Sequence, residues 1–200
     1  SRIVGNGTQV LIANGGAAYI DDGTKFYKPI ISYARGTCTI AGTTVTWVSG
    51  DDFSLVTAGE LFQINGVVYS IVTVTDTTHL ELPATPPAFP AATSFQIGTE
   101  YLQAATIATI DGYGIAAKPN SRDWCISGIN DFSTWDAADN ARKNGFPDNI
   151  AYVSSIPGGE VWLFGFNTTE IWRNTGAGDF PFQRVPGGLI NYGVSAPWSV

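Results

Sequence analysis

The sequence is poor in the residues that most often carry catalysis or hold metals. Among its 200 residues there is one histidine, His79, two cysteines and no methionine. Structural zinc sites take four Cys or His ligands, commonly from a C-x-x-C pair, and the chain has no such pair. It also lacks the Gly-x-Ser-x-Gly elbow of serine hydrolases and the Gly-rich loop of phosphate binders. The sequence therefore predicts no metal, no cofactor and no enzyme.

The two cysteines, Cys38 and Cys125, are far apart in the sequence. Cysteines without a partner usually lie in the protein interior, so two buried thiols are the favoured interpretation. Spacing alone cannot decide whether two cysteines form a disulfide, and that alternative stays open.

Charged residues are scarce as well. They make up 14% of the chain, and the net charge is −7, against about 25% charged residues in an average soluble protein. An acidic chain repels phosphate, which argues against wrapping nucleic acid as its main role. Passive contact with double-stranded DNA passing through a channel is still compatible with this charge.

Long apolar runs are also absent, although 44% of the residues are hydrophobic. No run reaches the ~18 residues that a membrane-spanning helix needs, and no targeting signal is visible, so we predict no membrane insertion. The apolar content is sufficient for a core, and the low charge suggests that much of the outside touches other protein. The chain starts at Ser1 without Met and stops inside an apparent strand at Val200, so we expect a piece of a longer polypeptide.

What the sequence does contain is a succession of short extended segments separated by Gly, Asp and Asn turns. Their spacing of roughly 8–12 residues is typical of all-β proteins. Only the stretch Trp135–Asn144 resembles a helix, and it is too short to be stable alone, so we expect a single turn or a loop. The clearest segments are 105–117, 124–135, 150–156, 161–166 and 170–172.

A stretch of different character interrupts this pattern at residues 32–97, which are rich in Thr and Val. Asn65-Gly66, between two apolar runs, predicts a two-residue hairpin turn. The Pro-rich segment Pro83–Pro90 ends strand pairing, because proline has no N–H to donate. We predict an inserted small β-barrel or sandwich at 32–97, with the Pro-rich segment as its return linker.

The segments on either side of this insert, about four per unit, suggest the blades of a β-propeller. Trp135-Asp136 is the kind of dipeptide found at blade strand ends, although no repeat of fixed period is visible. We therefore predict an all-β fold of partial β-propeller blades, with first strands at 1–31, the insert at 32–97 and further blades at 98–200.

A series of short motifs follows in the same order as in a known protein family. Residues 98–200, and more loosely 4–31, resemble the packaged-DNA-stabilisation proteins of tailed bacteriophages, the tail-hub or head-closure component of short-tailed phages. The insert resembles small β-domains of phage virion proteins through Gly50–Phe53, Ala58–Glu60, Gly66–Tyr69 and Val74–Leu80. The family motifs are Asp111-Gly112-Tyr113, Ser127–Trp135, Phe146-Pro147-Asp148, Gly159–Gly165, Thr169–Trp172 and Asn174–Phe182.

This resemblance implies a structural virion protein of the phage tail, present in the host cytoplasm during assembly. It implies a β-propeller subunit that forms a homo-oligomeric ring below the portal and adaptor rings. Such a ring helps to retain packaged DNA and carries tail parts such as the spike or needle proteins. Catalysis is no part of that role.

Aromatic and basic residues are the candidate contacts with such partners, since interface hot spots favour Trp, Tyr and Arg. About two-thirds of the tryptophans are expected to fill blade cores instead. The basic residues of the C-terminal half, Lys143 and Arg122 among them, are expected mainly on the solvated surface. The interface candidates are Trp135, Trp172, Arg142, Arg173 and Arg184.

Two functions are alternatives to a structural virion protein. The aromatic content and the β-insert are compatible with a carbohydrate-binding, receptor-recognition module of a phage tail. A hydrolase would need Asp131, Asp136 or His79 as catalytic groups. Aspartates in turns more often accept hydrogen bonds from nearby backbone N–H groups, so we expect Asp131 and Asp136 to be turn residues.

Overall fold

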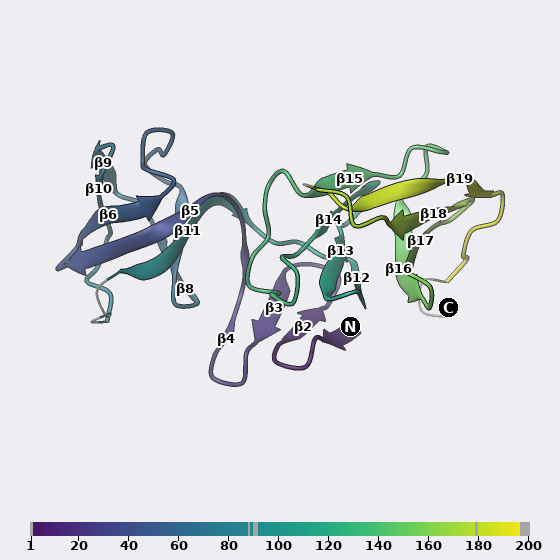
Figure 1. The fold of residues 1–200 in the computed structure, drawn as a ribbon, viewed down its shortest axis with the longest axis horizontal. Coiled ribbons are helices and arrows are strands. Elements are labelled where there is room, and N and C mark those ends of the chain that lie inside the picture. The colour runs from purple at the N-terminus through teal and green to yellow at the C-terminus, as the bar shows by residue number, and fades with distance from the viewer. Residues whose placement is uncertain (1, 88, 90–91, 179, 197–200) are drawn as a thin grey trace. The chain divides into compact units, whose positions relative to one another are not determined.

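The structure is a computed structural model that describes residues 2–87, 89, 92–178 and 180–196 (Figure 1). Every helix or strand assigned in these ranges is a β-strand, which confirms the all-β prediction. Within these ranges there is no helix long and apolar enough to cross a membrane. The chain forms two compact units, one made of Ser1–Pro29 with Leu102–Val200 and the other of Ile30–Tyr101.

The larger unit begins with a four-stranded antiparallel sheet, called blade 1 here. Its strands are β1 (Arg2–Gly5), β2 (Val10–Ala13), β3 (Ala18–Asp21) and β4 (Phe26–Tyr27), paired in sequence order. Tight turns join them, and the Asn14 carboxamide oxygen accepts a hydrogen bond from the Gly16 N–H at 3.2 Å in one of these turns. Strand order therefore follows chain order, as in the blades of a propeller.

A second sheet of the same kind, blade 2, follows the insert. It contains β12 (Thr106–Ile110), β13 (Tyr113–Ala117), β14 (Asp123–Ile126) and β15 (Asn140–Arg142), again in sequence order. The β12–β13 hairpin turns at Asp111-Gly112, whose φ angles are 50° and 85°. Asp and Gly tolerate this left-handed conformation, which matches the twist of the flanking strands.

Blade 3 completes the larger unit. Its strands are β16 (Ile150–Ile156), β17 (Glu160–Gly165), β18 (Thr169–Asn174) and β19 (Phe182–Ile190), once more in sequence order. The stretch Trp135–Asn144, expected to be a single turn or a loop, forms turns and the short strand β15. Its high density of turn-forming Asp and Asn residues accounts for this outcome.

The first strands of the three blades are neighbours in space: β1 lies beside β12, and β12 lies beside β16. The Arg2 guanidinium of β1 also donates a hydrogen bond to the Val153 carbonyl of β16 at 2.9 Å. It lies over the Tyr152 ring, 4.6 Å from its centroid. The larger unit therefore has its blades arranged around their innermost strands, as in a propeller.

The smaller unit is one seven-stranded sheet in the order β8-β7-β11-β5-β6-β10-β9, curled into a half-barrel. Asn65 and Gly66 form the predicted tight turn between β7 and β8, with φ angles of 52° and 78°. The strands are β5 (Ile30–Ala41), β6 (Thr44–Gly50), β7 (Leu61–Ile64), β8 (Val67–Ser70), β9 (Thr73–Asp76), β10 (His79–Glu81) and β11 (Thr93–Tyr101).

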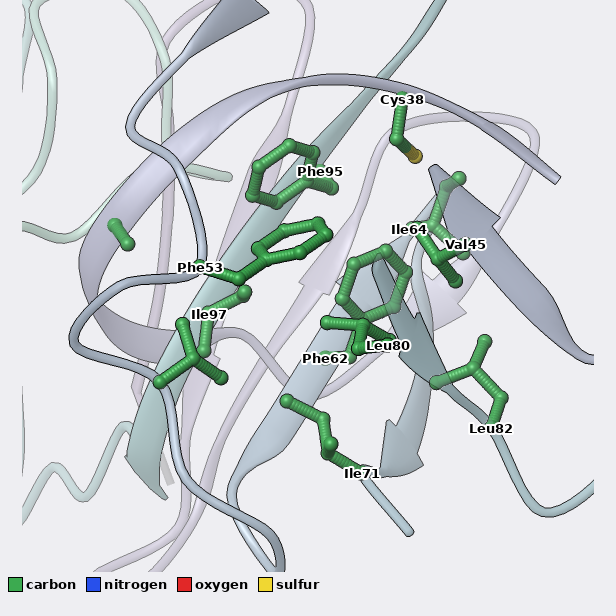
Figure 2. Packing of buried hydrophobic residues seen from close by; sticks show 12 residues of the cluster. Cys38, Val45, Phe53, Phe62, Ile64, Ile71, Leu80, Leu82, Phe95 and Ile97 are labelled. Carbon is green, nitrogen blue, oxygen red and sulfur yellow. The ribbon is translucent and has the colours of Figure 1, made fainter. Parts of the chain in front are cut away.

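Three phenylalanines fill the centre of this curled sheet (Figure 2). The Phe95 ring stacks on Phe62 with centroids 5.5 Å apart and meets the edge of Phe53 at 5.6 Å. All three side chains are buried, together with aliphatic groups such as Leu80 and Ile97. The half-barrel thus has a hydrophobic core of its own, as an inserted domain requires.

The two ends of this unit lie side by side, because Ile30 at the start of β5 pairs with Tyr101 at the end of β11. Adjacent ends let a domain be inserted between two blades without spreading them apart. The predicted insert, 32–97, lies inside this unit. Its predicted return linker, Pro83–Pro90, lies between β10 and β11 and falls partly outside the described residues.

Replacing Gly98 with alanine tests the close approach of β5 and β11. A Cβ atom at Gly98 would collide with the backbone carbonyl of Ile31, at a point where the pairing register shifts. We expect G98A to lower the free energy of unfolding by about 1–3 kcal/mol, the usual cost of overpacking. Urea unfolding of G98A measures this loss.

The control is Gly178→Ala, where a Cβ meets nothing within 4 Å. It should change stability by less than about 0.5 kcal/mol. Equal stability of the two variants would contradict a tight β5–β11 contact.

Candidate functional site: interface residues and the junction of blades 2 and 3

Two of the interface candidates form ion pairs across neighbouring strands of one blade. The Arg142 Nε atom lies 2.5 Å from Oδ1 of Asp123, joining β15 to β14. The Arg173 Nη2 atom lies 2.6 Å from Oε1 of Glu160, joining β18 to β17. Both arginines expose about half of their side chains. Such exposed pairs stabilise a protein by only about 0–1 kcal/mol, so both arginines remain available to a partner.

Each of these pairs favours the charged form of its carboxylate. The hydrogen bond from Arg142 lowers the pKa of Asp123, and the hydrogen bonds from Arg173 and the Trp162 indole lower the pKa of Glu160. Both carboxylates are therefore ionised at neutral pH. The two blades present paired charges of both signs at these positions.

Trp172 lies in the contact between blades 2 and 3. Its ring meets the Trp124 ring edge to face, with centroids 5.2 Å apart, and Trp124 also contacts Phe180 and Phe182. Trp124 and Phe182 are buried, while Trp172 is partly exposed. Edge-to-face aromatic contacts of this kind add to the burial of apolar area and hold the two sheets together.

Trp135 requires a correction: its side chain is fully buried and is a core residue, not an exposed anchor. Its indole N–H donates to the Phe132 carbonyl at 2.7 Å, inside the loop between β14 and β15. Phe132 is also buried and lies close to Gly114 of β13. A partner could reach Trp135 only by unfolding this loop.

One fully buried charged group was not predicted from the sequence. Lys143 was expected on the surface with the other basic residues, yet its side chain is fully buried just after β15. Its ammonium group forms an ion pair with the Asp148 carboxylate and donates to the Thr168 hydroxyl at 2.8 Å. A buried lysine needs such partners, because moving an unpaired charge out of water costs several kcal/mol.

The Asp148 carboxylate is fully occupied by donors from blade 3. The backbone N–H groups of Asn167 and Thr168 donate to its Oδ2 at 2.8 and 3.2 Å, and the Thr168 hydroxyl donates to Oδ1. Burial by itself raises the pKa of Asp148. The donors, led by Lys143, outweigh that effect and lower the pKa below its ordinary value. A Cβ at Gly165 would collide with this carboxylate, so glycine is required there.

A second carboxylate accepts hydrogen bonds from the segment that contains Lys143 and Asp148. Oε2 of the buried Glu170 on β18 accepts hydrogen bonds from the N–H groups of Asn144 and Gly145, at 3.0 and 2.9 Å. The remaining candidate, Arg184 on β19, lies 3.9 Å from the other Glu170 oxygen and is half exposed. Residues 143–148, which connect blade 2 to blade 3, are thus tied to blade 3 by side-chain hydrogen bonds as well as by packing.

Each of the three side chains named for hydrolysis has partners close to it in the sequence. Asp131 accepts hydrogen bonds from Ser133 and Thr134, and Asp136 accepts one from the Ala138 N–H, as expected of turn aspartates. His79 belongs to the separate half-barrel and contacts Asp76 and Thr78. These contacts assign the aspartates to turn formation.

Metal-binding side chains are dispersed. In the part of the chain that the structure describes, no three His, Cys, Asp or Glu residues gather where they could hold an ion. Both cysteines are free thiols: Cys38 is buried in the core of the half-barrel, whereas Cys125 on β14 of blade 2 is only partly buried and not fully buried as expected. Burial raises the pKa of the Cys38 thiol to about 11, so this thiol is protonated and unreactive at neutral pH.

Removing the ammonium group of Lys143 tests the buried pair. We expect Lys143→Met to lower the free energy of unfolding by about 3–5 kcal/mol, because the Asp148 charge stays buried without its cation. Urea unfolding at neutral pH measures the loss. Arg142→Met, which breaks an exposed pair one residue earlier, should cost no more than about 1 kcal/mol. A loss at Lys143 as small as that at Arg142 would contradict a buried pair.

Stability should also depend on pH through Asp148. Because its folded pKa is lowered, its contribution is fully present above the unfolded pKa of about 3.9 and is lost as pH falls through the folded pKa. The difference in unfolding free energy between wild type and Asp148→Asn should therefore shrink below about pH 4. Thermal or urea unfolding from neutral to acidic pH measures it. A difference that stayed constant with pH would contradict the lowered pKa.

Comparison with known proteins agrees with this architecture. The family described as bacteriophage P22 Gp10, β-propeller, matches residues 16–200, which include β3 and β4 of blade 1, the half-barrel and blades 2 and 3. No curated protein matches the chain. The matched region covers the great majority of the sequence, and the four-stranded blades of the chain have the fold that the family description names. The chain therefore belongs to the β-propeller family of bacteriophage P22 Gp10, the phage structural proteins that stabilise packaged DNA.

Proposed function

We propose that this protein is a subunit of the tail hub, or head-completion ring, of a short-tailed phage. In this role it forms a closed homo-oligomer at the portal and adaptor rings, in the tail part of the virion. It assembles in the host cytoplasm, helps to retain the packaged DNA and carries tail parts such as spike or needle proteins. It works by packing and assembly, without catalysis.

The observation that carries this proposal is the match of residues 16–200 to a phage DNA-stabilising family, together with the blade architecture. The junction of blades 2 and 3 supports it physically. A protein that resists the pressure of packaged DNA must keep its sheets from separating, and a buried ion pair and edge-to-face aromatic contacts oppose such separation. The low charge of the chain also suits contact with other proteins.

The remaining interface candidates fit this role in different ways. Arg142 and Arg173 are half exposed at blade surfaces, where they can exchange an internal ion pair for one with a partner. Arginine is favoured at such positions because its planar group binds carboxylates through two hydrogen bonds. With a net charge of −7, any contact with DNA is passive, as in the wall of a channel.

Native mass spectrometry tests this function on the protein alone and after mixing with the portal and adaptor proteins of a short-tailed phage. We expect a closed oligomer, formed alone or on the adaptor ring. A second mixture contains the protein with Arg142→Glu and Arg173→Glu. This variant should bind the connector proteins more weakly, because its new carboxylates repel the acidic groups that the arginines would pair with. A chain that stays monomeric and binds no connector protein would overturn the proposal.

A further inference from the structure

The chain contains four Asn-Gly pairs, and the structure surrounds each of them with different contacts. They are Asn6-Gly7, Asn14-Gly15, Asn65-Gly66 and Asn144-Gly145. Asparagine is a heat-labile residue, and it deamidates most readily when glycine follows, because glycine has no side chain to hinder ring closure and its backbone rotates freely. The contacts of each pair therefore decide which asparagine reacts in the folded protein.

The reaction needs no reactant other than water. The glycine nitrogen attacks the side-chain carbonyl carbon, Cγ, of the asparagine; a C–N bond forms, and the side-chain nitrogen takes the proton of the attacking N–H and leaves as ammonia. Water then cleaves one C–N bond of the resulting succinimide ring, its hydroxyl going to carbon and its proton to nitrogen. Cleavage at Cγ gives aspartate, and cleavage at the main-chain carbonyl gives isoaspartate. Ring closure therefore requires a glycine N–H without a hydrogen bond and a carboxamide that can turn toward it.

At Asn144-Gly145 the attacking nitrogen is occupied. The Gly145 N–H donates to Oε2 of Glu170 at 2.9 Å, and the Asn144 N–H donates to the same oxygen at 3.0 Å. Glu170 is completely buried, so breaking these bonds would leave its charge without donors and cost the desolvation penalty of that group. The attachment of this segment to blade 3 thus protects Asn144.

At Asn6-Gly7 the carboxamide is held at both ends. Its Oδ1 accepts hydrogen bonds from the N–H groups of Thr8 and Gln9, at 3.1 and 2.8 Å, and its Nδ2 donates to Oε1 of Gln9 at 3.2 Å. The same Gln9 oxygen accepts from the Phe132 N–H at 2.6 Å, which ties it to the loop between β14 and β15. Turning the carboxamide toward Gly7 would break these contacts.

Asn65-Gly66 is restrained by its backbone. The two residues form the turn between β7 and β8, with φ angles of 52° and 78°, and the pairing of Ile64 with Val67 closes the turn. Ring closure requires rotation of the backbone at the asparagine. A two-residue turn allows little rotation while its flanking strands stay paired.

Asn14-Gly15 is the least restrained pair among the described residues. Both residues are exposed, in the turn between β2 (Val10–Ala13) and β3 (Ala18–Asp21) (Figure 1). In the part of the chain that the structure describes, the Asn14 carboxamide makes one hydrogen bond, from the Gly16 N–H to Oδ1 at 3.2 Å, and the Gly15 N–H has no partner. Because this bond spans Gly15, it keeps the carboxamide beside the Gly15 nitrogen. It also withdraws electron density from the carbonyl under attack, as the donors of an oxyanion hole do.

We propose that Asn14 is a site of spontaneous deamidation in the folded protein and that it reacts before the other three Asn-Gly pairs. Aspartate at this position keeps an oxygen that can accept from the Gly16 N–H, so the turn persists with one more negative charge. Isoaspartate instead lengthens the main chain by one carbon atom, next to the pairing of Ala13 with Ala18. The connection between β2 and β3 of blade 1 therefore changes with the age of the protein.

Peptide mapping by mass spectrometry tests this on the folded protein, aged at neutral and mildly alkaline pH. Deamidation replaces an NH2 group by OH, so each modified peptide gains a defined mass, and electron-based fragmentation separates aspartate from isoaspartate. We expect modification at Asn14 first, at a rate that rises with pH because the attacking nitrogen must lose its proton. Asn14→Gln is the matched control, and it should lose this modification, because its longer side chain would have to form a six-membered ring.

The same ageing in concentrated guanidinium chloride supplies the second measurement, with circular dichroism to establish which samples are folded. Unfolding removes the contacts of all four pairs, so their rates should become similar. A lead of Asn14 in the folded protein that disappears on unfolding would support the proposal. It would be overturned if Asn6, Asn65 or Asn144 reacted first in the folded protein, if Asn14 reacted only after unfolding, or if the four rates kept the same ranking in both states.

Discussion

The buried contact between Lys143 and Asp148 joins the two ends of the segment that connects blade 2 to blade 3. Two charges taken out of water are tolerated only when their remaining donors and acceptors are also satisfied. Here Thr168, two backbone N–H groups and a required glycine complete the cluster. The geometry of the connecting segment is therefore closely determined, and the relative position of the two sheets depends on it.

Besides this polar cluster, aromatic rings pack between blades 2 and 3. Trp124, Trp172 and Phe182 meet edge to face and bury large apolar areas. The two kinds of contact have different roles. Apolar burial gives stabilisation without a strict geometry, whereas the ion pair and the Glu170 hydrogen bonds allow only one arrangement. Both kinds of contact hold blades 2 and 3 together.

The half-barrel is stabilised by contacts of its own. Its core contains a cluster of phenylalanines, and its two ends are paired strand to strand (Figures 1 and 2). It therefore requires nothing from the blades for its core. In the larger unit, by contrast, each blade is stabilised by its neighbour.

Much of this architecture follows from the sequence alone, because it depends on local chemistry. Alternating apolar residues and Gly, Asn and Asp turns predicted the strands, and Asn65-Gly66 predicted its hairpin, since few residues accept those backbone angles. The sequence also predicted the turn roles of Asp131 and Asp136 and an inserted β-unit near residues 32–97. The tertiary structure decided what depends on distant neighbours. It buried Trp135 and Lys143, which by type alone were expected to face partners or solvent, and it brought Asp148, just before β16, to Thr168 in the turn between β17 and β18. Burial of a charge or an aromatic ring is a property of what surrounds it, and a linear pattern does not contain those surroundings.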